Sequence, residues 1–238
     1  MSMAHKAAIV TGVGPGLGAA LCRNLAAAGY AVAGVARGNQ VEEGLRAEIS
    51  ADGGTYRHIC ADVADPASLS TAIAHVEQEQ GAASVFIHNA SQLVIAPFAE
   101  LTPERFTQAW QVACLGAMVG AQAVIPGMLS QGGGTIIFTG ATASVRGGAR
   151  FAAFASAKFA LRALAQSLAR EFGPHGIHVA HVLLDGLIWS ERTRQRSNPA
   201  QEKCMAPDAI AQQYLNLIAQ DRSTWTHELD LRPFGESF

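Results

Sequence analysis

The sequence predicts an α/β protein: a single domain in which a doubly wound parallel sheet lies between two layers of helices. Three features indicate it. Short, continuously apolar runs alternate with helical patterns along almost the whole chain, as is typical of parallel strands buried on both faces. The 238 residues suit one α/β domain. With 49% hydrophobic and 15% charged residues, the composition is that of a compact globular protein.

Strands and helices alternate in the way that such a sheet requires. The predicted strands are Ala7–Val10, Ala31–Ala36, Tyr56–Cys60, Ser84–His88, Thr135–Thr139, Ile177–Leu184 and His227–Leu231. The predicted helices are one from Leu17 to near Gly29, then Pro66–Gln80, a long one from Pro103 to about Leu129, Arg150–Phe172 and Pro207–Gln220. Right-handed crossovers between parallel strands would place these helices on both faces of the sheet.

The helix assignments rest on spacing and composition. Leu17, Leu21 and Leu25 recur every four residues, which is the spacing of one helix face, and Gly29 is a typical residue at which a helix ends. The polar stretch Ser190–Lys203 has no clear periodicity. We expect it to be either a mobile loop over a site or a plain surface connection.

Charge and cysteine content exclude several classes of protein. The net charge is −2 and the basic residues are scattered, which argues against binding of nucleic acid or of a membrane surface. We expect no secretory signal and no apolar run long enough to cross a bilayer, and therefore a cytoplasmic protein. The four cysteines are widely spaced: Cys22, Cys60, Cys114 and Cys204. We expect them to be free thiols in a reducing compartment and not metal ligands, with metal ligation as the alternative.

A glycine-rich turn, Thr11-Gly-Val-Gly-Pro-Gly-Leu-Gly18, joins the first strand to the first helix. Gly12 permits a tight turn, Gly16 lets the backbone approach a pyrophosphate, and Gly18 lets the helix pack closely. The amides that begin the helix, from Leu17 onward, would then face the anion. Because the motif follows a strand and opens a helix within a βαβ unit, it predicts a Rossmann-type dinucleotide site rather than an ordinary turn.

The end of the second strand bears on which nicotinamide dinucleotide would bind. An acidic side chain there would bind the ribose 2′-hydroxyl of NAD(H). This chain has Ala36 and Arg37 instead, so no carboxylate repels a 2′-phosphate and Arg37 can pair with it. The sequence therefore favours NADP(H) over NAD(H), the alternative being that Arg37 is a solvated surface cation.

Beyond the glycine turn, further motifs make the chain resemble the short-chain dehydrogenase/reductase family over nearly its whole length. The matching motifs are Thr11-Gly-x-x-x-Gly-x-Gly18, Asp62-Val63, Asn89-Ala90, Gly134-Thr-Ile-Ile-Phe-Thr-Gly140, a helix with Lys158, and Asp185-Gly-x-Ile-x-Ser190 where the family has Pro-Gly-x-Ile-x-Thr. The resemblance implies a three-layer Rossmann fold and a small carbonyl or alcohol substrate. It also implies a homodimer or homotetramer formed through the helices Pro103–Leu129 and Arg150–Phe172.

The resemblance further implies roles for single residues. Asp62 would meet the adenine amino group, and Val63 would pack beside the ring. Lys158 would bind ribose as a cation, the alternative being a snorkelling lysine on the surface. Asn89 and Ala90 would border the cofactor, and Ile188 and Ser190 would hold the nicotinamide amide.

The residues that transfer protons in this family are missing. Typical members have a tyrosine four residues before the lysine and a serine thirteen before that tyrosine, and here these positions hold Phe154 and Ala141. The supporting asparagine aligns with Ala113, and the tyrosine of an enoyl-reductase variant aligns with Phe151. Neither phenylalanine nor alanine can protonate an alkoxide, and loss of a general acid typically costs about 10²–10⁴-fold in rate.

Other polar groups are candidate replacements. Asp185 stands near the expected nicotinamide end, where a raised pKa would let it act as acid or base, while a helix or turn cap is the alternative. His181 lies on a mostly apolar strand, and we expect a satisfied core histidine. Hydroxyls near these positions in the sequence are those of Ser91, Thr139, Thr142, Ser144 and Ser156.

Two functions remain open. In the first, the protein is an NADP(H)-dependent oxidoreductase in which a water or hydroxyl near Lys158 gives the proton. Ala141, Phe151, Phe154 and Asp185 would then border a pocket for a small hydrophobic substrate. In the second, the protein is an inactive dinucleotide-binding protein that acts as a sensor or interaction module. The intact glycine turn favours the first function and the missing serine and tyrosine favour the second.

Overall fold

The structure, a computed structural model, describes residues 6–235 and contains a seven-stranded parallel sheet. The strands are β1 (Ala7–Thr11), β2 (Ala31–Ala36), β3 (Thr55–Cys60), β4 (Ala83–His88), β5 (Gly134–Thr139), β6 (Ile177–Leu184) and β7 (Glu228–Leu231). The α-helices are α1 (Leu17–Ala27), α2 (Glu42–Ala51), α3 (Pro66–Gln80), α4 (Pro103–Trp110), α5 (Gly116–Ser130), α6 (Ala152–Phe172), α7 (Glu191–Ser197) and α8 (Pro207–Ile218). The predicted fold class is confirmed.

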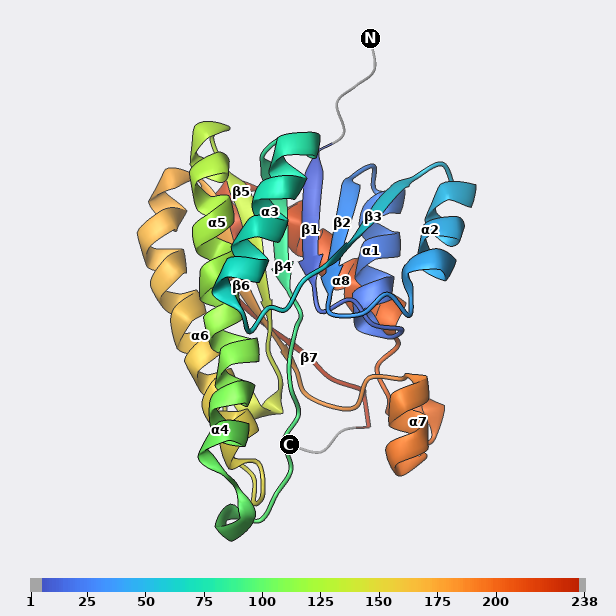
Figure 1. Cartoon of the computed structure of the whole chain (residues 1–238), viewed down its shortest axis with the longest axis vertical. Helices are drawn as coiled ribbons and strands as arrows, with labels where there is room; N and C mark the ends of the chain where they lie inside the picture. Colours follow the sequence, from blue (N-terminus) through green and yellow to red (C-terminus); the bar gives the residue numbers. More distant parts are fainter. Residues whose placement is uncertain (1–5, 236–238) are drawn as a thin grey trace.

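The strand order β3-β2-β1-β4-β5-β6-β7 creates a crevice at the carboxyl ends of β1 and β4. From β1 the chain continues to β2 and β3 on one side, and it then returns to place β4 on the other side of β1. The crossovers from β1 and from β4 therefore lead in opposite directions. Ligands of open α/β sheets bind at such a switch point. Figure 1 shows α3, α5 and α6 on one side of the sheet and α1 and α8 on the other.

The core lies on both faces of the sheet because alternate strand residues point to opposite sides. In β1, Ala8 and Val10 pack with α1, α2 and α8, whereas Ile9 packs with α3, α5 and α6. All three side chains are fully buried. Burial on both faces explains why the strands read as continuous apolar runs rather than as alternating patterns.

The long helix predicted from Pro103 to about Leu129 is present, but it contains a π-helical turn, η2 (Gln111–Leu115), between α4 and α5. Over Pro103–Ser130 this helix is long and apolar enough to cross a membrane, by length and composition alone. The expectation that no apolar run has that length was therefore wrong for this segment. Most of it is buried, against α3, α6 and β4, which is how the core helix of a globular domain behaves.

Two helices were not predicted. In α2 only Leu45 and Ile49 are buried, so its apolar pattern is weak. The other, α7, buries no residue and depends on polar contacts: Ser190 Oγ accepts a hydrogen bond from the Thr193 amide at 3.1 Å. Ser190–Lys203 therefore contains a short helix where no regular structure was expected, and residues of this helix line a cavity, so the segment is not merely a surface connection. Figure 1 shows this helix apart from the sheet, beyond the carboxyl ends of its strands.

Candidate cofactor crevice and active site

The glycine turn is shaped by contacts that leave no room for a side chain. Gly12 has a φ of 74°, and a Cβ placed on it would lie 2.5 Å from the backbone of Ala90. Asn89 Nδ2 donates a hydrogen bond to the Gly12 carbonyl oxygen at 3.1 Å. A Cβ on Gly18 would lie 2.6 Å from that same oxygen. Asn89 and Ala90 thus brace the turn from the end of β4.

The amides at the start of α1 are available to an anion. The amide of Ala19 donates a hydrogen bond to the Gly14 carbonyl at 3.0 Å, and the amide of Ala20 donates one to the Gly16 carbonyl at 3.2 Å. Across residues 6–235, no group accepts a hydrogen bond from the amides of Leu17 or Gly18. Two free amides at a helix N-terminus, beside a glycine-rich turn, fit the pyrophosphate of a dinucleotide.

Arg37, Asp62 and Val63 lie at the neighbouring carboxyl ends of β2 and β3, which are joined by the hydrogen bond from the Ala61 amide to the Ala36 carbonyl. Arg37 is exposed and has no ion-pair partner in the described chain. Asp62 Oδ1 accepts from the Ala64 amide at 3.0 Å, and Val63 is buried. An adenosine bound at this edge of the crevice would therefore meet the unpaired guanidinium of Arg37 and the carboxylate of Asp62, which is fixed by its hydrogen bond from the Ala64 amide.

Lys158 is not a surface lysine. Only 1% of its surface is exposed, and its Nζ donates to the Thr139 carbonyl at the end of β5, at 2.7 Å. Nζ also lies 5.8 Å from the centre of the Phe154 ring. Burial lowers the pKa of this amine to about 8. The charge thus sits at the same edge of the sheet as the free amides of α1.

A cavity of about 730 Å³ opens beside Lys158. Its wall includes Lys158, Ile188 and Asn89, together with three of the four positions at which the family's polar residues are replaced: Ala141, Phe151 and Phe154. The fourth, Ala113, is buried in η2 and is not part of the wall. Spacing along α6 explains part of this, since residues 151, 154 and 158 fall on one helix face. Phe159, by contrast, faces outward with 43% of its surface exposed.

Asp185 and Ser190 are not part of the cavity wall. The Asp185 carboxylate accepts a hydrogen bond from the Thr142 hydroxyl and pairs with Arg232 at 2.8 Å and with Arg146 at 3.9 Å. It is therefore a buried ion-pair partner rather than a cap. Ser190 caps α7, and its Cβ would lie 3.5 Å from a Cβ placed on Gly16, so the start of α7 faces the glycine turn.

Of the candidate hydroxyl residues, Ser91, Thr139 and Thr142 line the cavity, whereas Ser144 and Ser156 do not. The Thr142 hydroxyl already donates its proton to Asp185. Thr139 Oγ1 bonds to the buried Tyr214 hydroxyl at 2.9 Å, on the face of the sheet covered by α8. Ser156 is exposed and outside the cavity wall. In the part of the chain that the structure describes, no tyrosine lines the cavity.

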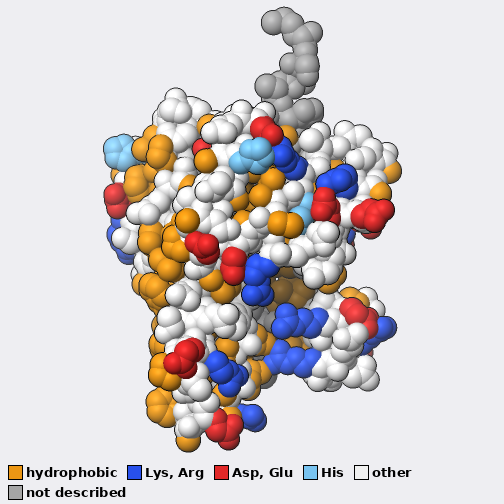
Figure 2. All heavy atoms as spheres, in the orientation of Figure 1, with side chains coloured by type: hydrophobic (Ala, Val, Ile, Leu, Met, Phe, Trp, Pro, Cys, Tyr) orange, Lys and Arg blue, Asp and Glu red, His pale blue; other side chains and the backbone are white. Residues whose placement is uncertain are grey.

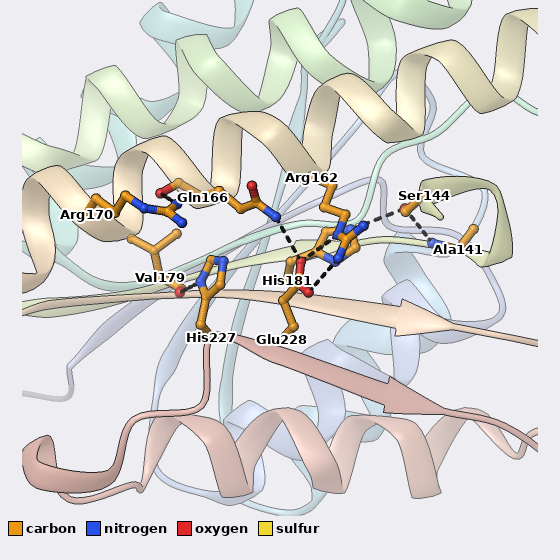
Figure 3. A network of polar contacts seen from close by, with 9 residues as sticks. All are labelled: Ala141, Ser144, Arg162, Gln166, Arg170, Val179, His181, His227 and Glu228. Atoms are coloured by element: carbon orange, nitrogen blue, oxygen red, sulfur yellow. Dashed lines mark hydrogen bonds and ion pairs between the residues drawn. The ribbon is translucent and has the colours of Figure 1, made fainter. Parts of the chain in front are cut away.

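Ser144 and His181 lie behind Ala141, as Figure 3 shows. Ser144 Oγ lies 3.2 Å from His181 Nε2 and accepts a hydrogen bond from the Ala141 amide. Burial, and next the charge of Lys158, lower the pKa of His181 to about 4. As expected from the sequence, His181 is a satisfied, neutral core histidine.

Sequence reasoning missed three arginines on the cavity wall: Arg146 after β5, and Arg192 and Arg196 on α7. The signal that could have found the last two is their spacing of four residues, which places side chains on one face of a helix. It was overlooked because Ser190–Lys203 was not recognised as containing a helix.

Known proteins resemble this chain in sequence and in structure. A family model described as short chain dehydrogenase matches residues 6–199. A D-threitol dehydrogenase from Mycolicibacterium smegmatis is 31% identical over 174 residues, which are 73% of this chain and 67% of that protein. A short-chain dehydrogenase structure from Rhodopseudomonas palustris matches with a TM-score of 0.81 at 36% identity, covering 96% of this chain and 99% of that one. An alcohol dehydrogenase from Thermococcus sibiricus, complexed with 5-hydroxy-NADP, matches with a TM-score of 0.88 at 26% identity and 98% coverage of both chains.

Proposed function

The chain belongs to the short-chain dehydrogenase family, and we propose that it is an NADP(H)-dependent oxidoreductase that interconverts a small carbonyl compound and its alcohol. One observation carries this proposal. The free amides of Leu17 and Gly18 and the buried Lys158 ammonium lie at the same edge of the sheet, beside a cavity of about 730 Å³. Such a crevice can hold a dinucleotide and present one end of it to a substrate.

The preference for NADP(H) rests on Arg37. Its guanidinium is exposed, has no ion-pair partner within residues 6–235, and follows β2, where the adenosine ribose of a bound dinucleotide would lie. The related alcohol dehydrogenase from Thermococcus sibiricus is complexed with an NADP derivative, which supports the same choice. We therefore expect Arg37 to bind the 2′-phosphate.

A bound nicotinamide cofactor would supply or accept the hydride, and the chain must provide the proton. We assign the proton to the Lys158 ammonium. It lies on the cavity wall, and burial has lowered its pKa to about 8, close to the pH at which a general acid works best. The hydroxyl of Thr142 is a poorer donor because it is already bonded to Asp185. Phe151 and Phe154 would exclude water from the apolar side of the cavity.

Cofactor binding is tested by thermal unfolding with NADPH and NADH. A ligand present at 100 times its Kd should add about 2.7 kcal/mol to the free energy of unfolding. We expect NADPH to stabilise the protein at lower concentrations than NADH does, and Arg37→Gln to remove that difference. If neither nucleotide stabilises the protein, the proposed function is wrong.

Turnover is tested with a panel of ketones and aldehydes, using the native protein and the double variant Phe154→Tyr with Ala141→Ser. We expect the native protein to oxidise NADPH with at least one carbonyl compound. If only the double variant is active, the native protein is a dinucleotide-binding protein without this activity, and the second function suggested by the sequence takes its place.

We further propose that the protein is a homodimer or homotetramer assembled through α4, α5 and α6. Large apolar side chains are exposed on these helices, with 38% of Phe106, 39% of Trp110 and 43% of Phe159 accessible. Light scattering after size-exclusion chromatography measures the assembly. We expect Phe159→Glu to reduce the assembled fraction, and a native protein that is monomeric at micromolar concentration would contradict the proposal.

A further inference from the structure

The cavity wall is cationic. Arg146, Lys158, Arg192 and Arg196 line it, and no aspartate or glutamate of the described chain does so. The protein as a whole has the opposite balance, with 19 acidic and 17 basic residues. A cavity with charges of one sign raises the local concentration of ligands of the other sign. The dehydrogenation chemistry proposed above needs only Lys158, so the arginines require a separate explanation.

Arg192 and Arg196 are the unpaired arginines of this wall. They are four residues apart on α7 and therefore share one face of that helix. Within residues 6–235 neither has an ion-pair partner, whereas Arg194 between them pairs with Glu191 at 2.6 Å. Arg146 is partly neutralised, because Asp185 lies 3.9 Å away. Figure 2 shows basic side chains on the side of α7 that faces a hollow next to the body of the molecule.

The cofactor phosphates do not account for these two arginines. A pyrophosphate would sit at the glycine turn, and no residue from Gly12 to Gly18 lines the cavity. The residue of the α7 segment that faces the turn is Ser190, opposite Gly16. Arg192 and Arg196 follow it, and each further residue carries the helix about 1.5 Å along its axis. Both side chains lie on the cavity beside Lys158, where a substrate would be bound.

Resting on the proposed function, we propose that the substrate is an oxo acid or hydroxy acid whose carboxylate is bound by Arg192 and Arg196. Guanidinium groups bind carboxylates through paired, charge-assisted hydrogen bonds. The reacting carbonyl then lies at Lys158, and Phe151, Phe154 and Leu187 contact the aliphatic carbons between the two groups. The cavity thus selects a molecule that is apolar in the middle and anionic at one end.

The first test compares acids with their uncharged esters. The probes are 4-oxopentanoate and 5-oxohexanoate, each beside its methyl ester, with NADPH oxidation as the readout. In the native protein we expect kcat/KM for the better acid to exceed that for its ester at least tenfold. Arg192→Gln with Arg196→Gln should reduce this ratio by about tenfold or more, mainly through KM. Arg194→Gln is the matched control on the same helix, and it should leave the ratio unchanged.

The second test needs no turnover. The probes are hexanoate and methyl hexanoate, and the readout is thermal stabilisation of the native protein with and without NADPH. We expect hexanoate to stabilise the native protein more than its ester does, and to lose this advantage at 0.5 M salt and in the double arginine variant. This arm applies even if no ketone is reduced, so failure of the proposed function is distinguishable from failure of the anion site.

Three results would overturn the inference. One is equal stabilisation by hexanoate and its ester, together with equal or faster turnover of the ester. Another is an acid-to-ester ratio that the double arginine variant leaves unchanged. The third is a Kd for NADPH, measured by fluorescence, that weakens tenfold or more in the double variant while the acid-to-ester ratio stays the same. That outcome would assign the arginines to the phosphates of the cofactor.

Discussion

Lys158 carries a positive charge among groups that are held neutral. His88 Nε2 lies 3.0 Å from the Val112 carbonyl, which can only accept, so this nitrogen carries the proton. Nδ1 then accepts from the Thr11 hydroxyl, also at 3.0 Å. Burial first, and then the charge of Lys158, lower the pKa of His88 to about 3. Neither His88 nor His181 therefore competes with the lysine as a proton donor at neutral pH.

If Lys158 is the general acid, carbonyl reduction should depend on its protonation. We expect kcat/KM for reduction to fall as the pH rises through about 8, because the free enzyme loses the ammonium proton there. Lys158→Met should reduce kcat/KM by about 10²-fold or more, whereas Lys203→Met, at an exposed position, should not. A pH profile that stays flat from pH 7 to pH 10 would assign the proton to another group.

Gly12 offers a prediction about the turn that holds the cofactor. Gly12→Ala combines a positive φ of 74° with a Cβ 2.5 Å from the Ala90 backbone, so the turn or β4 must shift. We expect a loss of more than about 1 kcal/mol in the free energy of unfolding. Gly14→Ala is the control, since a Cβ there meets nothing within 4 Å. Urea unfolding of both variants measures the difference, and equal losses would contradict the geometry described for Gly12.

At the scale of single residues, the sequence predicted what regular spacing controls. Ala141, Phe151, Phe154 and Lys158 meet at one cavity because three of them share a helix face and the fourth lies just after β5. Asp185 was expected at the same place, but its partner Arg232 comes from the end of the chain, beyond β7. A partner so distant in sequence leaves no local signal.

Among the helices, those with an apolar face were predicted and those without one were not. The long helix of α4 and α5 was predicted, but the π-helical turn Gln111–Leu115 within it was not. The carbonyl of Val112 in this turn bonds to His88, which β4 supplies from 24 residues earlier in the chain. Contacts of this kind depend on the tertiary fold, so periodicity within the helix does not reveal them.

The order of α7 should depend on its N-cap, because this helix buries no side chain. Ser190→Ala removes the oxygen that accepts from the Thr193 amide at 3.1 Å. A cap is worth about 1 kcal/mol, so we expect amide exchange in α7 to become about fivefold faster. Hydrogen exchange followed by mass spectrometry measures this, with α6 as the internal control. Unchanged exchange at 191–197 would mean that other contacts hold α7.

For the whole molecule, the sheet could be predicted in content but not in arrangement. The seven apolar runs and the glycine turn indicated parallel strands with helices on both faces, and the sheet has these. The order of the strands in the sheet was not predicted. Strands that are buried on both faces have similar compositions, so composition does not reveal which strands are neighbours. The position of the crevice came instead from the glycine turn, which can bind a dinucleotide only at the carboxyl end of its strand.

Two buried neutral histidines should make the stability of the whole domain depend on pH. The pKa values of His88 and His181 in the folded protein are about 3 and about 4, below the value of about 6.5 expected in the unfolded chain. Between these limits the unfolded state binds more protons, so stability is retained above about pH 6.5 and is lost as the pH falls. The slope approaches about 1.4 kcal/mol per pH unit for each histidine.

Urea unfolding at pH 7.5, 6.0 and 5.0 measures this dependence. We expect the free energy of unfolding to decrease steadily toward pH 5.0 in the native protein, and to decrease less in His88→Gln, whose amide can still donate to the Val112 carbonyl. His75→Gln is the matched control, because 47% of the His75 side chain is exposed. His88 lies on β4, the central strand, and His181 lies on β6, which is paired on both sides, so their protonation should unfold the domain as one unit. Equal slopes in the native protein and in His88→Gln would show that other groups control the acid sensitivity.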